Sequence, residues 1–409
     1  MLEPDTNCAR GNVGYVPTSY FLEFLFNLVL WPFRLRKRDV APASLVTRPH
    51  FIIFRVGAIG DYIISAPFVD VLRRYYPSST ITVLGTKALG PLTSLYQAPD
   101  QLIASDIVGL KKISKLISFS TISQLKLIAA QLKKADERIF ICLNRQETIM
   151  GTLKCMLFQL LCRPLLSFGF NTRGRGDFLT YSVADNGYLE KHEVDYFNAI
   201  SQQILAHVPI REEVSLPVAT MRRVSTAAGA DIKVTTLVVH PGGGSDPSIE
   251  KWANKRWPVT CYVELINQLS VGRELVVILT GSKDELHLAS AIEEKVVAKV
   301  TNLAAKTNFE ELQNILAGAD LFLGSDSGVS HLASYLDVPS VVLYFYTDYI
   351  GFSPIGKHTV VVRPEIACSP CLYWFDRRPC KGTDWSYKCR DVITVERVRA
   401  ELHRFFPSP

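Results

Sequence analysis

Three observations predict an α/β protein made of two Rossmann-like domains that face a central cleft. The chain has 409 residues, which is too many for one ordinary hydrophobic core. Short apolar runs typical of buried strands alternate with amphipathic segments typical of helices, which predicts parallel sheets covered on both faces. This alternation stops at a polar segment, residues 211–233, and then starts again. Ligands bind such sheets beside the carboxyl ends of strands, so we expect the site in a cleft lined by those ends.

The elements follow from the same pattern. The first half predicts strands at 51–56, 80–85 and 138–144 and helices at about 62–76, 121–135 and 193–207. Between 145 and 192 glycines are frequent, and a looser section is expected. The second half predicts strands at 236–240, 274–280, 320–325 and 339–345 and helices at 258–270, from about 284, at 307–319, at 327–336 and at about 394–405. Thr307 or Asn308, followed three residues later by Glu, is a capping-box pattern for the helix at 307–319.

Composition places the chain among globular proteins, because 48% of its residues are hydrophobic and 21% are charged. The formal net charge of +6 fits an anionic substrate or a membrane surface, and the lack of long Lys/Arg blocks argues against a nucleic-acid binder. Nine cysteines at irregular spacing do not match the disulfide framework of a small secreted protein. We therefore expect a cytoplasmic protein.

Residues 20–38, YFLEFLFNLVLWPFRLRKR, are apolar and aromatic and then basic. The apolar part is too short for a membrane span, and the basic residues follow it instead of preceding it, which argues against a signal peptide. Two alternatives stay open. The segment is either an interfacial anchor, with Trp31 and Phe33 among lipid headgroups and the basic residues on anionic lipid, or a helix packed on the protein's own surface.

The stretch FRVGAIGDYIISAP, residues 54–67, places Asp61 where a buried strand gives way to a helix. Gly57 and Gly60 allow a sharp turn and a close approach of a ligand to the backbone. An aspartate here is a favoured helix N-cap. It would also point into the cleft, where it could accept a proton from a substrate hydroxyl as a general base. The two roles are compatible.

The stretch SDSGVSHLA, residues 325–333, is a second turn from a strand into a helix. Backbone amides at a helix start bind anions, because the helix dipole lies behind them. Asp326, Ser327 and Gly328 would form this turn, and the Ser327 hydroxyl could add a donor. His331, one turn further on, could reach the same anion, and a structural role is its alternative.

Two more turns of the second half have a similar character. HPGGG, residues 240–244, would expose glycine amides, including that of Gly243. Lys255 follows in the KRWP segment, where its charge could offset that of a diphosphate, unless it belongs to a solvated basic pair. In LTGSKDE, residues 279–285, Asp284 or Glu285 could accept hydrogen bonds from a ribose or simply favour a helix start. The sequence contains neither GxxxxGK[ST] nor GxGxxG after a strand, which argues against ATP hydrolysis and dinucleotide binding.

The segment CSPCLYWFDRRPCKGTDWSYKC contains Cys368, Cys371, Cys380 and Cys389. A C-x₂-C pair followed by two further cysteines fits a structural metal site with four thiolate ligands, for which zinc and iron are both chemically suitable. Reduced thiols or a redox-dependent disulfide are the alternatives.

Taken in order, several segments resemble the ADP-heptose:lipopolysaccharide heptosyltransferases of glycosyltransferase family 9. They are FRVGAIGDYIISAPFVDVLRRYYPSSTITVLG, KRWP, LTGSKDE, NLAAKTNFEELQNILAGADLFLGSDSGVSHLASYLDVPSVVLY and the cysteine-rich tail. The resemblance implies the GT-B fold and an inverting, metal-independent transfer of a heptose from ADP-heptose to a lipopolysaccharide core or a related surface glycan. It implies no cofactor for the chemistry. The alternatives are a GT-B transferase that uses another nucleotide sugar and a non-catalytic nucleotide-sugar-binding protein.

The resemblance also implies roles for individual residues. Asp61 falls on the family's general base, Lys255 on its phosphate-binding lysine, and Glu285 most nearly on its ribose-binding acid. The donor-binding loop of the family corresponds to Asp326, Ser327, Gly328, Val329 and His331. Residues 345–348, FYTD, lack the Gly-Pro turn that is frequent in the family, which leaves the nucleotide or sugar open.

The expected organisation has four parts: an apolar and basic segment at 1–49, an acceptor domain at 50–215, a nucleotide-sugar domain with the cysteine-rich tail at 216–393, and a terminal helix at 394–409. The expected partners are a nucleotide-diphosphate sugar, a lipid-linked or glycan acceptor and an anionic membrane surface, with no nucleic acid. The protein would lie at the cytoplasmic face of the inner membrane. Arg145, Arg173 and Arg175 would either meet an acidic lipid sugar or be ordinary surface residues.

Overall fold

The structure is a computed structural model. It describes residues 46–95, 98–108, 118–132, 137–185, 187, 190–211, 235–244, 255–371 and 388–405. The chain divides into two compact units, an N-terminal unit of Val13–Val218 and a C-terminal unit that contains Ala219–Pro409. The boundary at 215/216 and the segment 20–38 lie outside the described residues and stay predictions.

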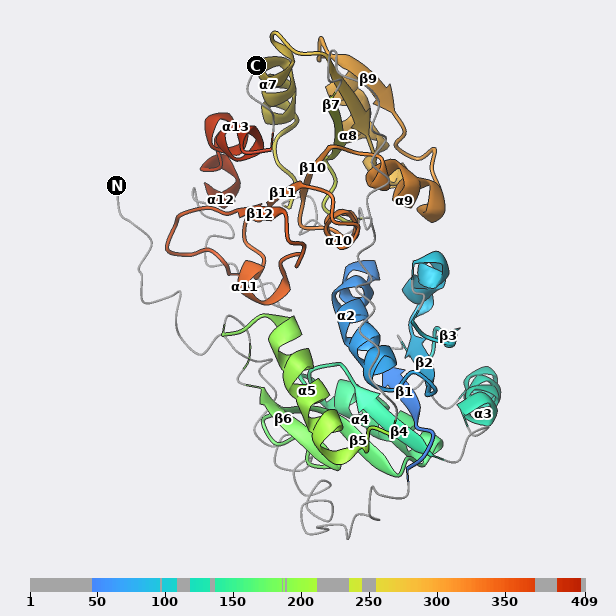
Figure 1. Ribbon diagram of the computed structural model, residues 1–409. Coiled ribbons are helices and arrows are strands. Elements are labelled where there is room, and N and C mark those ends of the chain that lie inside the picture. The colour runs from blue at the N-terminus through green and yellow to red at the C-terminus, as the bar shows by residue number, and fades with distance from the viewer. Residues whose placement is uncertain are drawn as a thin grey trace. The chain divides into compact units, whose positions relative to one another are not determined.

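The N-terminal unit contains one doubly wound sheet (Figure 1). Its strands are β1 (His50–Phe54), β2 (Thr80–Gly85), β3 (Gln101–Ala104), β4 (Arg138–Cys142), β5 (Leu166–Thr172) and β6 (Tyr181–Asp185). They pair in parallel in the order β3-β2-β1-β4-β5-β6. The direction of winding reverses between β1 and β4, and ligands bind such sheets at this switch point.

Helices cover this sheet. They are α2 (Ile59–Tyr75), α3 (Phe119–Leu132), α4 (Ile149–Cys162) and α5 (Glu193–His207), and a 3₁₀ helix spans Lys87–Ser94. Side chains alternate in direction along each strand. Accordingly, Ile52 and Phe54 of β1 pack in a core cluster with side chains from α3 and α4, whereas Phe51 contacts Tyr76 at the end of α2, with 5.0 Å between ring centroids.

The C-terminal unit repeats the plan. Its strands are β7 (Thr235–His240), β8 (Leu275–Leu279), β9 (Lys299–Asn302), β10 (Leu321–Ser325), β11 (Ser340–Leu343) and β12 (Thr359–Val362), in the parallel order β12-β11-β10-β7-β8-β9. Its helices are α7 (Val259–Ser270), α8 (Leu286–Glu293), α9 (Phe309–Ala317), α10 (Gly328–Tyr335), α11 (Tyr349–Phe352), α12 (Lys388–Asp391) and α13 (Val395–His403), with a 3₁₀ turn at Lys283–Glu285. The switch point lies between β7 and β10.

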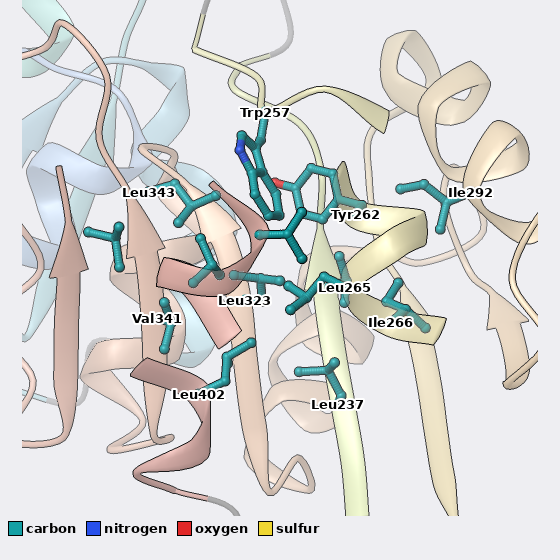
Figure 2. Packing of buried hydrophobic residues seen from close by; sticks show 14 of the residues in the cluster. Leu237, Trp257, Tyr262, Leu265, Ile266, Ile292, Leu323, Val341, Leu343 and Leu402 are labelled. Atoms are coloured by element: carbon teal, nitrogen blue, oxygen red, sulfur yellow. The ribbon is translucent and has the colours of Figure 1, made fainter. Parts of the chain in front are cut away.

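A closely packed core fixes these strands. Tyr262, Leu265 and Ile266 of α7 pack against the sheet, where Leu237, Leu323 and Val341 come from three neighbouring strands (Figure 2). Leu402 of α13 joins the same cluster. The strand ends that carry the candidate residues therefore stand on a rigid base.

The predicted α/β fold class is confirmed, and the capping box is confirmed at Asn308, which exchanges hydrogen bonds of 2.8 and 2.9 Å with Glu311. The expected looser section is wrong, because it contains α4, β5 and β6. Gly169 lies inside β5, where an added Cβ would come 2.7 Å from the carbonyl oxygen of Cys142. This glycine serves close packing between strands and marks no loop. Within the described ranges, the helices all fall short of the length and apolar character that crossing a membrane requires.

Candidate active site

Asp61 stands at the switch point of the N-terminal unit, one turn after β1. It is the third residue of α2, and the N-cap position predicted for it belongs to Ala58. Its Oδ2 atom accepts a hydrogen bond of 2.7 Å from the Ala58 amide, so the carboxylate still closes the start of the helix. A Cβ added to Gly57 would lie 2.5 Å from the Asp61 Cβ. Glycine at 57 is therefore required for this turn.

A buried cation faces the other oxygen of Asp61. Arg55 Nη2 lies 3.3 Å from Asp61 Oδ1 and 2.8 Å from Glu193 Oε2. Burial acts to lower the pKa of Arg55, but the charges of Glu193 and Asp61 outweigh it and raise that pKa above its ordinary value. The guanidinium is thus a fixed positive charge. The Asp61 side chain keeps 27% of its surface exposed, so it can still meet a substrate.

The turn before Asp61 is held from both sides. Asn144, just after β4, accepts a 2.7 Å hydrogen bond from the Val56 amide and donates a 2.8 Å bond to the Val56 carbonyl. Thr86, after β2, donates to the Gly57 carbonyl at 2.9 Å. The sequence interpretation missed these two residues and Glu193. The signal for Asn144 was its place at the end of a predicted strand beside β1.

The three arginines suggested for an acidic acceptor lie in different environments. Arg145 is buried, 3.4 Å from Asp185 Oδ1, and donates to the Gly187 carbonyl at 2.7 Å. Arg175 is also buried and donates to backbone carbonyls, including that of Gln146 at 3.2 Å. The expectation of surface positions is therefore wrong for both. Arg173 is exposed.

Glu147, also missed, is a half-buried acid in the same unit. Burial raises its pKa to about 8, although the charge of Arg145 acts to lower it. The raised pKa favours the protonated form of this carboxyl group more than in an exposed glutamate. Glu147 follows β4, beside the switch point.

In the C-terminal unit, Lys255 and Asp326 form an ion pair with 2.5 Å between Nζ and Oδ2. Burial acts to raise the pKa of Asp326, but the charge of Lys255, its hydrogen bond and the nearby His331 hold that pKa below its ordinary value. Trp257, two residues after Lys255, is buried and donates from Nε1 to the Ile393 carbonyl at 2.9 Å. This anchor fixes the lysine beside the end of β10.

The predicted anion loop is the start of α10. Ser327 is its N-cap and accepts a 3.4 Å hydrogen bond from the Ser330 amide. Gly328 and Val329 are the first two helical residues, and amides at these positions have no acceptor within their own helix. His331 is buried one turn further on. The helix start thus presents backbone donors next to the Lys255 ammonium.

Glu285 holds the glycine loop from within. Its side chain is 3% exposed and accepts hydrogen bonds from the Ser282 amide and hydroxyl, each 2.9 Å, and from the Gly244 amide at 3.2 Å. Burial opposes its charge, but His240 and these donors lower the pKa of Glu285 below its ordinary value. A Cβ on Gly242 would meet Glu285 Oε1 at 1.9 Å, and Gly243 is buried in the same loop. A contact between Glu285 and a ribose stays a prediction.

The cysteine-rich tail is only partly described. Cys389 is buried and Cys368 and Cys371 are half-buried, whereas Cys380 lies outside the described residues. Among the side chains that the structure does describe, no group of three or more His, Cys, Asp or Glu could hold a metal ion. The four-thiolate site for zinc or iron stays a prediction.

Comparisons with known proteins identify the family and the fold of the chain. The family model "Glycosyltransferase family 9 (heptosyltransferase)" matches residues 154–381, more than half of the chain. The lipopolysaccharide core heptosyltransferase OpsX of Haemophilus influenzae is 25% identical over 79% of this chain and 84% of its own length. The lipopolysaccharide heptosyltransferase 2 of Salmonella typhimurium is 34% identical, over 39% of this chain and 45% of its own length.

Solved structures share the fold. The E. coli ADP-heptose lps heptosyltransferase II matches 87% of this chain and 98% of its own with a TM-score of 0.58 and 20% identity. The E. coli heptosyltransferase WaaC with ADP matches 87% of this chain and all of its own with a TM-score of 0.62 and 18% identity. The two parallel sheets are therefore those of a GT-B glycosyltransferase.

Proposed function

Because the chain belongs to glycosyltransferase family 9, the heptosyltransferases, we propose that it transfers a heptose from ADP-heptose to a lipopolysaccharide core or a related surface glycan. The acceptor is supported by a relative named lipopolysaccharide core heptosyltransferase. The donor is supported by a solved structure named ADP-heptose lps heptosyltransferase II. The observation that supports a catalytic role is the partly exposed carboxylate of Asp61 beside the fixed charge of Arg55.

The proposed reaction inverts the anomeric carbon in one displacement. The acceptor hydroxyl gives its proton to Asp61 while its oxygen bonds to the anomeric carbon. The bond from that carbon to the diphosphate oxygen breaks, and its electron pair leaves with ADP. General-base help of this kind is worth about 10²–10⁴-fold in rate.

The leaving diphosphate gains negative charge as the bond breaks. We assign its stabilisation to Lys255, held by Asp326, and to the amides of Gly328 and Val329 at the start of α10. Ser327 and His331 complete this loop. These donors can offset the charge of a diphosphate, so we propose a metal-independent transfer, which is checked by assaying the enzyme after chelation.

The proposed acceptor is lipid-linked, so we place the enzyme at the cytoplasmic face of the inner membrane as a peripheral protein. The buried Glu285 would keep the glycine loop, including Gly243, in position for the nucleotide. Gly60 follows the turn that leads into α2 and lets the helix start close to a ligand.

A donor screen tests the proposal. Purified protein is incubated with a heptose-free lipopolysaccharide acceptor and ADP-heptose, or with UDP-, GDP- or CMP-sugars, and product is measured by mass spectrometry. We expect turnover with ADP-heptose and little with the others. Faster turnover with another nucleotide sugar would show that this sugar, and not ADP-heptose, is the donor. Binding of ADP-heptose without turnover on any acceptor would instead favour a non-catalytic binding protein.

A further inference from the structure

Helix α3 of the N-terminal unit has an unusual outer face. Phe119, Ile122 and Leu127 are 89%, 41% and 63% exposed. Spacings of three, five and eight residues place them within a single arc of the helix, together with the exposed Ser123, Lys126 and Ala130. The opposite side of α3 is ordinary, because Ile128 and Leu132 are buried in the core cluster of the unit. The outer face therefore exposes large apolar side chains.

The sequence on both sides of this helix carries charge of one sign. Lys126 is the only charged residue in the sequence of α3, FSTISQLKLIAAQL. Between Asp106 and Asp136 the sequence contains six lysines and no acidic residue. The net charge of this segment is therefore as large as that of the whole chain, +6. Five of these lysines lie outside the described residues, and only their charge is used here. A solvated helix would be expected to carry charges of both signs on its outer face.

Exposed apolar residues on a helix whose one charged residue is a lysine match the chemistry of an anionic lipid surface. Phe and Leu side chains enter the boundary between headgroups and acyl chains, while lysines stay on the anionic headgroups. A protein partner fits less well, because Lys126 lies within the exposed arc and lysine is depleted from protein interfaces.

We propose that the outer face of α3, formed by Phe119, Ile122, Lys126 and Leu127, docks on anionic lipid. The docking surface is independent of the transfer chemistry and of residues 20–38. It deepens the proposed function in one respect, since it would bring the N-terminal unit to the surface that holds a lipid-linked acceptor.

The test uses the full chain and vesicles of phosphatidylethanolamine and phosphatidylglycerol at a ratio of about 3:1. On an anionic surface, each nearby lysine adds about fivefold to binding. The double variant Phe119→Glu/Leu127→Glu should bind at least about tenfold more weakly, because two apolar side chains no longer enter the interface. The matched control is Val271→Glu/Val297→Glu, which changes two valines that are 78% and 82% exposed in the C-terminal unit. We expect this control to bind like the wild type.

A second measurement reports contact directly. Leu127→Trp should be quenched by brominated lipid more strongly than Val297→Trp. Wild-type binding by the α3 double variant, or equal quenching at both positions, would overturn the proposal. A wild type that is dimeric without vesicles and an α3 variant that is monomeric would also overturn it, because the face would then bind a second copy of the chain. Transfer to a soluble, lipid-free acceptor should be unchanged in the α3 variant. If the wild type binds vesicles but transfers no heptose, only the proposed function is overturned.

Discussion

The acidic residues that follow strands in the two units are held in different ways. In the C-terminal unit, Glu285 is 3% exposed and accepts three hydrogen bonds, and Asp326 forms an ion pair with Lys255. In the N-terminal unit, Asp61 also meets a cation and an amide, yet 27% of its side chain remains exposed. Acids that are satisfied from within keep a binding loop in shape, whereas an acid with an open side can exchange a proton. We infer a division of labour, with the base in one unit and the donor site in the other.

The largest effect is expected from Asp61→Asn. The amide keeps an oxygen for the Ala58 amide but cannot accept the acceptor's proton, so kcat should fall by about 10²–10⁴-fold. Steady-state kinetics measures this. Asp70→Asn, an exposed site on the same helix, is the control and should keep wild-type kcat. A wild-type rate in Asp61→Asn would reduce Asp61 to a helix-capping residue.

Lys255→Ala should have the next largest effect. It removes one charge-assisted contact with the leaving group, worth about 1.5–3 kcal/mol, or about 10- to 150-fold in kcat/KM. Lys299→Ala, an exposed lysine of β9, should leave kcat/KM unchanged. Equal kinetics for the two variants would place the diphosphate elsewhere.

Gly57→Ala tests whether the position of the Asp61 carboxylate matters, because it shifts that side chain without changing its chemistry. The added methyl group would start 2.5 Å from the Asp61 Cβ, so the turn and the carboxylate must shift. We expect kcat to fall by about tenfold or more, because misplacement by about 1 Å is costly in catalysis. Gly90→Ala in the same unit is the matched control, since its added Cβ meets nothing within 4 Å. If both variants keep wild-type kcat, the position of Asp61 does not matter.

The smallest effect concerns acid stability. The folded-state pKa of Glu285 is lowered, so its carboxylate stabilises the fold above its ordinary pKa of 4.5, and this contribution is lost as the pH falls below that value. Glu285→Gln should cost about 1–3 kcal/mol at pH 7 and reduce the fall in stability between about pH 5 and 3. Hydrogen exchange of β7 and β8 measures it within the C-terminal unit. An unchanged pH dependence would show that Glu285 is not the group that titrates.

The sequence predicted the fold class and most central strands, because these are short apolar runs bounded by turn residues. The strand at 320–325 is found at Leu321–Ser325, and the helix at 193–207 at Glu193–His207. The four edge strands β3, β6, β9 and β12 were missed, and so was β5. Strands β3, β9 and β12 have four residues each and are partly exposed, so their apolar pattern is weak.

The sequence located the turns that carry the candidate residues but not the side chains that pair with them. Asp61, Lys255 and Ser327 lie after strands in glycine-rich or basic turns, which are local features. The contact of Arg55 with Glu193 joins residues 138 positions apart, and that of Lys255 with Asp326 joins residues 71 apart. Such pairs depend on tertiary packing, so no local pattern could reveal that Arg55 pairs with Asp61 and Glu193 or that Asp326 holds Lys255.

The division of labour is tested most directly by measuring the ADP-heptose dissociation constant and the single-turnover transfer rate on the same preparations of Asp61→Asn and Lys255→Ala. Asp61→Asn should bind the donor like the wild type and transfer at least about 10²-fold more slowly, because the base acts only in the chemical step. Lys255→Ala should lose both affinity and rate. If Asp61→Asn loses donor affinity in proportion to its rate, or Lys255→Ala keeps full affinity and rate, the assignment of base and donor site to separate units is contradicted.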